Sequence, residues 1–134
     1  MPACIRIVLR HFGIDLAEKA ISRACKTTPR GTDQDEAAKG VAVFGVKAAK
    51  LEEASFDDIT QYLQQGCPVI VFLSVLHLPY GGQVGIHAVV VNGFGAHDVS
   101  FVDPARGEEI AINRDTFLAA WGERGYLGLV IEAY

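Results

Sequence analysis

Residues 86–104 read IHAVVVNGFGAHDVSFVDP, and this stretch decides the fold because it predicts two β-strands joined by a glycine-containing turn. With residues 93–97 as the turn, antiparallel pairing places three pairs of residues opposite each other: Val91 and Val99, Val89 and Phe101, and His87 and Asp103. Side chains alternate along a strand, so all six are expected on one face. An imidazole beside a carboxylate suits a general base held by an orienting acid. The same pair also fits a structural hydrogen bond between strand ends, and spacing alone leaves both interpretations open.

Outward from this hairpin, the pattern of apolar residues predicts the other elements. Further strands are expected at residues 68–75, 108–113 and 126–134. Apolar residues at helical spacing predict helices at residues 2–12, 16–25, 33–44, 56–65 and 114–125. Four polar residues are the expected helix N-caps: Asp15, Thr32, Ser55 and Asn113. The order predicts an α+β domain, in which a helical part at about residues 1–66 packs on an antiparallel sheet at about residues 67–134.

The composition predicts one globular domain over residues 1–134, because half of the 134 residues are hydrophobic. A net charge of −4 with both signs interspersed argues against a nucleic-acid partner. The apolar run at residues 69–76 is too short to cross a bilayer, and no signal-peptide pattern opens the chain. Three widely spaced cysteines form no disulfide framework. We therefore expect no membrane segment and a cytoplasmic location.

A cysteine at a helix N-terminus is the natural partner for a His/Asp pair, because the helix dipole and an imidazolium both stabilise a thiolate. Cys4 occupies such a position, and no GxSxG motif offers a serine instead. Cys4 is also compatible with a packing role. Cys25 and Cys67 are expected to be packing residues. The other histidines have no ligand at metal-binding spacing, so no metal and no cofactor is expected: His11, His77 and His97.

The segment at residues 78–85, LPYGGQVG, precedes His87 and allows two interpretations. Its glycines and Tyr80 fit the border of a groove for an extended peptide. They equally fit an ordinary long connection between strands.

Six segments together carry a family resemblance: residues 2–13, 30–48, 66–74, 78–94, 99–107 and 117–131. In this order they resemble the double-glycine-leader peptidases, which process bacteriocins, and their stand-alone relatives. The resemblance is most specific in HAVVVNGF and FVDPA, and it implies the papain-like cysteine-peptidase fold. It also implies that His87 is the general base and Asp103 its orienting acid.

The chain departs from the family pattern at its front. The family motif resembles Asp-Cys-Gly-Pro-Ala-Cys, with the first cysteine as nucleophile and an earlier glutamine helping to form the oxyanion hole. Aligned on residues 2–4, Met1 takes the place of the glycine, the nucleophile falls one residue before Met1, and Cys4 matches the second cysteine, a packing residue. Two functions remain: a non-catalytic module that binds a peptide or partner protein, or an active leader-processing thiol peptidase whose nucleophile lies upstream or is Cys4.

Overall fold

A six-stranded antiparallel sheet runs through the middle of the computed structural model, which describes residues 1–78 and 85–133. The strands lie in the order β1-β6-β2-β3-β4-β5. Their bounds are β1 (Val46–Leu51), β2 (Val69–Ser74), β3 (Ile86–Phe94), β4 (Asp98–Asp103), β5 (Glu108–Asn113) and β6 (Gly128–Ala133). The helices are α1 (Pro2–His11), α2 (Glu18–Ala24), α3 (Gln34–Val41), α4 (Phe56–Gln64) and α5 (Arg114–Gly122), with short 3₁₀ turns η1 (Ala42–Phe44) and η2 (Val75–His77).

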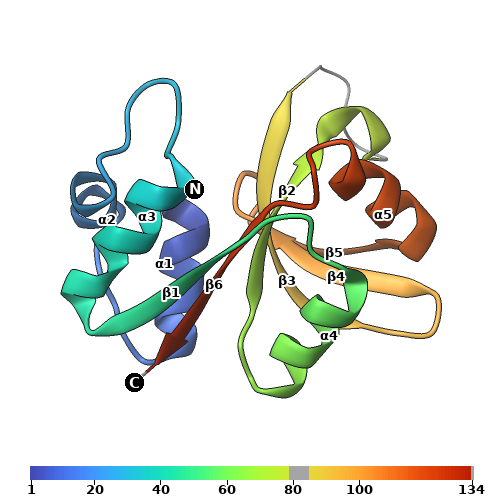
Figure 1. Ribbon diagram of the computed structural model, residues 1–134, viewed down its shortest axis with the longest axis horizontal. Coiled ribbons are helices and arrows are strands. Elements are labelled where there is room, and N and C mark those ends of the chain that lie inside the picture. The colour runs from blue at the N-terminus through green and yellow to red at the C-terminus, as the bar shows by residue number, and fades with distance from the viewer. Residues whose placement is uncertain (79–84, 134) are drawn as a thin grey trace.

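Helices cover both faces of this sheet (Figure 1). Alternate side chains of the strands enter two separate cores, as in β3, where Val89 packs in one and Val90 in the other. Helices α1, α2 and α3 close the core that contains Val90. Helices α4 and α5 close the core that contains Val89. Trp121 of α5 also lies in this core. The helical part expected on one face is therefore only one of two helical layers.

Helix starts follow the predicted caps at two positions and depart from them at two others. Ser55 caps α4 in a capping box with Asp58, and Asn113 caps α5, as predicted. The prediction for Asp15 is wrong, because its carboxylate accepts a hydrogen bond from Arg10 and α2 begins only at Glu18. The other correction concerns Thr32, which was predicted to cap α3. Asp33 caps this helix, whereas the Thr32 hydroxyl bonds to the Thr27 hydroxyl at 2.7 Å.

Strand β1 lies in the part of the chain that was expected to be helical. Its sequence, VKAAKL, has alanines and lysines that are uncommon in strands, so propensity does not reveal it. Pairing with β6 along its whole length supplies the hydrogen bonds and holds it in the sheet. The sheet thus begins at Val46, well before residue 67.

The register of the β3–β4 hairpin also differs from the predicted one. Val91 pairs with Phe101 instead of Val99, because the strands extend to Phe94 and Asp98 and a bulge interrupts the pairing between Val91 and Gly93. The slip between predicted and observed register is two residues. A slip of two leaves every side chain on its predicted face, whereas a slip of one would reverse them all. The face shared by residues 87, 89, 91, 99, 101 and 103 is therefore as predicted, although the opposing pairs are not.

Candidate functional site

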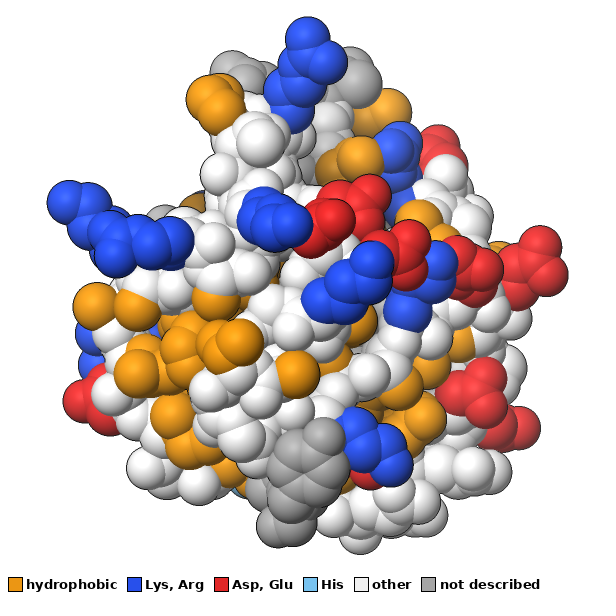
Figure 2. Space-filling model, turned by 60° about the vertical axis from the view of Figure 1, so that its left-hand side comes forward, with side chains coloured by type: hydrophobic (Ala, Val, Ile, Leu, Met, Phe, Trp, Pro, Cys, Tyr) orange, Lys and Arg blue, Asp and Glu red, His pale blue; other side chains and the backbone are white. Residues whose placement is uncertain are grey.

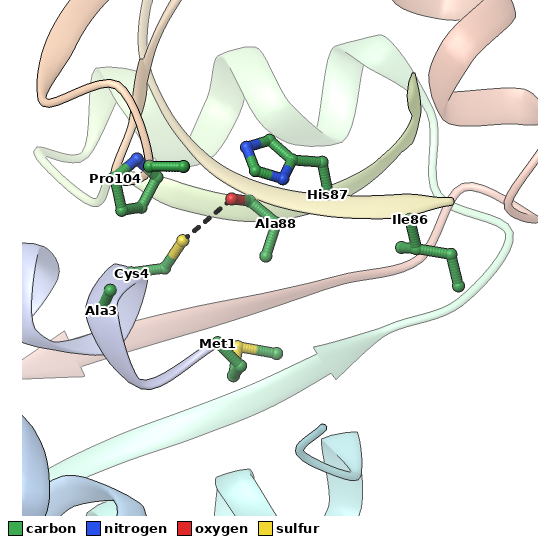
Figure 3. Close-up of a pocket in the computed structure, with 8 residues that line it drawn as sticks. Met1, Ala3, Cys4, Ile86, His87, Ala88 and Pro104 are labelled. Atoms are coloured by element: carbon green, nitrogen blue, oxygen red, sulfur yellow. Dashed lines mark hydrogen bonds between the residues drawn. The ribbon is translucent and has the colours of Figure 1, made fainter. Parts of the chain in front are cut away.

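A hollow of about 350 Å³ opens where the first turn of α1 meets the start of β3 and the turn after β4 (Figure 3). We call it the dyad hollow. Its lining combines one histidine and one thiol with mostly small or apolar residues: Met1, Ala3, Cys4, Ile86, His87, Ala88, Pro104 and Ala105. The β3–β4 pairing ends at Val90 and Val102, so the start of β3 has no β4 neighbour beside this hollow.

His87 and Asp103 are in direct contact at the hollow. The Nε2 atom of His87 lies 2.6 Å from Oδ1 of Asp103, although the two residues meet diagonally and not face to face in the ladder. The Asp103 side chain is fully buried, whereas 29% of the His87 side chain is exposed. An ionised carboxylate only accepts hydrogen bonds, so Nε2 donates and Nδ1 of a neutral imidazole is left as an acceptor.

The turn after β4 fixes the Asp103 carboxylate. Its Oδ1 atom also accepts a hydrogen bond from the backbone N–H of Ala105, at 2.9 Å. The aspartate side chain thus accepts from the backbone N–H two residues later in the chain, which is a common arrangement in a turn. Sequence reasoning did not identify the role of Ala105, although an aspartate followed by proline is a recognisable signal for such a turn.

The Cys4 thiol belongs to the packing of α1 and makes no hydrogen bond to the imidazole among the described residues. Its Sγ donates to the carbonyl oxygen of Ala88 at 3.2 Å, and the residue is 1% exposed. In Figure 3 the His87 ring lies on one side of strand β3, and Cys4 lies on the other. Burial is the main cause that raises the pKa of the Cys4 thiol to about 12, and the charges of Asp103 and Glu18 act in the same direction.

The remaining candidates from the sequence lie away from the dyad hollow. Cys25 and Cys67 are buried in different cores, and burial raises the pKa of both thiols. The three other histidines do not line it: His11 contacts the carbonyl of Gly66, His77 pairs with Glu123, and His97 is exposed. Tyr80 lies outside the described residues. Within residues 1–78 and 85–133, no group of three or more His, Cys, Asp or Glu could hold a metal ion.

The charges on the side of the molecule that carries α1, α2 and α3 are mixed in sign (Figure 2). Figure 2 turns the side of α1, α2 and α3 toward the viewer, and basic and acidic side chains lie interspersed across it. None of the described helices is both long enough and apolar enough to cross a bilayer.

Comparison with known protein families identifies the family of this chain. A family model described as the Peptidase_C39 like family matches residues 1–129. No curated protein is significantly similar to the chain.

Three solved structures share the fold. A protein described as a C39-like peptidase, from Bacillus anthracis, is 15% identical, with a TM-score of 0.80 over 99% of this chain and 88% of that chain. The peptidase domain of Streptococcus ComA, a bifunctional ABC transporter of a quorum-sensing pathway, is 19% identical, with a TM-score of 0.78 over 99% and 90%. A double-glycine-motif protease from an AMS/PCAT transporter, solved with its leader peptide, is 18% identical, with a TM-score of 0.70 over 99% and 84%. The predicted α+β, papain-like fold is confirmed.

Proposed function

The chain belongs to the peptidase C39-like family, and on that premise we propose that residues 1–134 bind an extended peptide in the dyad hollow without cleaving it. One observation carries the proposal. The hollow holds an oriented His87–Asp103 pair, while the thiol that lines it, Cys4, is buried and bonded to Ala88. The site therefore keeps the shape and acid–base pair of a peptidase beside a thiol that is not activated.

The start of β3 supports binding of an extended peptide. The residues of β3 that precede Val90 have no β4 partner among the described residues, and the carbonyl of Ala88 already accepts from Cys4, so a peptide can lie along Ile86 and His87 and use their backbone hydrogen-bonding groups, as peptides do when they add to a sheet edge. Nδ1 of His87 offers one more acceptor for a peptide N–H. The alanines and proline that line the hollow suit a peptide segment with small side chains.

The state of Cys4 argues against cleavage by this thiol. Burial raises the pKa of this thiol to about 12, so the thiol is protonated at neutral pH, whereas the thiolate is the nucleophile. The hydrogen bond to Ala88 further occupies the S–H group. Without a thiolate near the imidazole, the His/Asp pair has no covalent route to a peptide bond.

A leader-processing thiol peptidase is the second candidate, because Met1 lines the same hollow as His87. A cysteine next to Met1 on its upstream side would therefore adjoin the imidazole. One solved relative was crystallised with its leader peptide, which makes a double-glycine leader the appropriate probe for both candidates.

The test uses a fluorescent double-glycine leader peptide, with binding followed by anisotropy and cleavage by mass spectrometry. Residues 1–134 should bind the peptide and leave it intact. A variant in which Gln-x-x-x-x-x-Asp-Cys-Gly replaces Met1 should cleave it, and His87→Ala should abolish that cleavage. His97→Ala is the matched control, because His97 is exposed and lies outside the hollow. Restoring the cysteine without the glutamine should give an enzyme weaker by about 10²–10³-fold, the usual effect of removing one oxyanion donor.

Two results would overturn the proposal. In the first, the unextended chain fails to bind the leader peptide at concentrations at which the extended chain binds it. Alternatively, the unextended chain cleaves the peptide and Cys4→Ala stops it, which would make Cys4 the nucleophile.

A further inference from the structure

A second hollow adjoins the dyad hollow along α1. The two share Ala3 and Pro104 as lining residues, so they form one groove that passes over these two side chains. The second hollow has a volume of about 360 Å³, and its charged lining residues are Arg6, Arg10 and Glu18. We call it the arginine hollow. Residues 3, 6 and 10 follow each other at helical spacing, so one face of α1 forms a wall along the whole groove.

Arg6 is the unusual residue of this hollow. Its Nε atom is buried and has no hydrogen-bond partner among the described residues. Buried polar groups in folded proteins nearly always have a partner, so the orphaned Nε–H of Arg6, a residue that lines the groove, needs an acceptor. Arg10 is already paired with Asp15, at 3.1 Å. Glu18 lines the hollow but forms no ion pair with Arg6.

We propose that the arginine hollow receives an acidic side chain of the peptide that lies in the dyad hollow. The inference rests on the proposed function and adds the class of peptide. A guanidinium presents its N–H donors in a plane that matches the two oxygens of a carboxylate. Rotation of the guanidinium also brings the Nε–H donor to the carboxylate. The chain as a whole carries a net charge of −4, so this preference must come from the local cation and not from a general field.

The position of the acidic residue follows from the geometry of α1. Arg6 lies three residues beyond Ala3, which is about 4.5 Å along the helix axis. An extended peptide advances about 3.3 Å per residue, and the arginine side chain adds its own reach. The acidic residue should therefore lie about two to four residues from the residue beside His87.

The experiment compares synthetic peptides with a central Gly-Gly pair in a neutral background. One glutamate is placed in turn at each position on either side of the pair, and glutamine at the same position is the uncharged match. At one position, about two to four residues from the pair, the glutamate peptide should bind about 5- to 20-fold more tightly than the glutamine peptide, as befits a charge-assisted pair. Anisotropy titration gives both dissociation constants.

Variants of Arg6 connect this ratio to the hollow. Arg6→Met should bring the ratio to about one and leave the glutamine peptide within about twofold of wild type, because only the charge pair is lost. Arg23→Met removes the same charge from an exposed site outside the hollow and should keep the ratio. Glu18→Gln should increase the ratio, because it removes a competing carboxylate. Circular dichroism checks folding, and Arg6→Gln replaces Arg6→Met if the latter does not fold.

The outcomes separate the two proposals. If the glutamine peptides bind but no position prefers glutamate, or if the preference survives in the Arg6 variants, the inference is wrong and the proposed function stands. If no peptide of either kind binds, the proposed function fails and the inference fails with it.

Discussion

At the scale of single residues, the His87–Asp103 contact was predictable from alternation along the two strands. The predicted opposing pair is wrong, since Val91 pairs with Phe101. The side chains nevertheless meet, because a shift of two residues preserves the face and a histidine is long enough to reach a diagonal neighbour. The bulge between Val91 and Gly93 was not predictable from alternation, and the strands are close just after it: a Cβ on Gly93 would lie 2.8 Å from Oγ of Ser100.

Cys4 should be chemically inert in the folded protein. Its pKa of about 12 lies above the ordinary value of 9.0, so the thiol remains protonated through the pH range in which an exposed cysteine ionises. Alkylation of Cys4 by iodoacetamide, followed by peptide mapping, should therefore be much slower at pH 8 than alkylation of an exposed cysteine. The same reaction in denaturant should be fast, since unfolding restores an ordinary thiol.

Rapid alkylation of native Cys4 at neutral pH, abolished by His87→Ala, would contradict this prediction. Such a result would show an activated thiolate beside the imidazole, which would make the site competent for cleavage.

At the scale of elements, local chemistry predicted some boundaries and tertiary contacts set the rest. Ser55 and Asn113 cap their helices as predicted, because each accepts a hydrogen bond from a backbone N–H of the first turn. Strand β1 was not predictable from its sequence, since its pairing with β6, near the other end of the chain, holds it in place. The arginine hollow was not predictable for a similar reason: Arg6 and Pro104 meet there only in the fold.

Gly40 in α3 tests how closely the helices of one layer are packed. A Cβ at this position would lie 2.5 Å from the carbonyl oxygen of Ala24 in α2, a backbone atom that cannot move aside alone. Alanine in place of a mid-helix glycine normally stabilises a helix by up to about 1 kcal/mol. Here the clash should reverse the sign, and Gly40→Ala should lower the free energy of unfolding by about 1–3 kcal/mol, as overpacked sites do.

Urea denaturation followed by circular dichroism measures this change. Gly95→Ala is the matched control, because no atom lies within 4 Å of a Cβ built there. A Gly40→Ala protein as stable as wild type would mean that α2 and α3 can separate at little cost.

At the scale of the whole molecule, the dyad hollow lies at a junction between layers. Ala3 and Cys4 come from α1 and Met1 immediately precedes this helix, which packs on one face of the sheet, while His87 and Asp103 come from the face that α4 and α5 cover. The site is therefore intact only when α1 is docked on the sheet. Whether the two helical layers unfold together decides whether the groove can open on its own.

We expect both layers to unfold in one transition, because the same strands hold both cores. Val89 and Val90 are neighbours in β3 with fully or almost fully buried side chains in opposite cores. Each valine-to-alanine change should lower the free energy of unfolding by roughly 1–3 kcal/mol through lost burial and an unfilled cavity. Trp121, the one tryptophan of the chain, lies in the core of Val89 and reports on that layer alone, whereas far-ultraviolet circular dichroism reports on all helices.

If the layers are coupled, Val90→Ala should shift the urea midpoint seen by Trp121 fluorescence as far as the midpoint seen by circular dichroism, and Val89→Ala should do the same. Glu109→Ala, an exposed change in β5, should shift neither. Coincident transitions are the expected sign of two-state unfolding. A Val90→Ala protein in which circular dichroism is lost at lower urea while the Trp121 signal persists would show that α1, α2 and α3 detach first, so that the peptide groove opens before the domain unfolds.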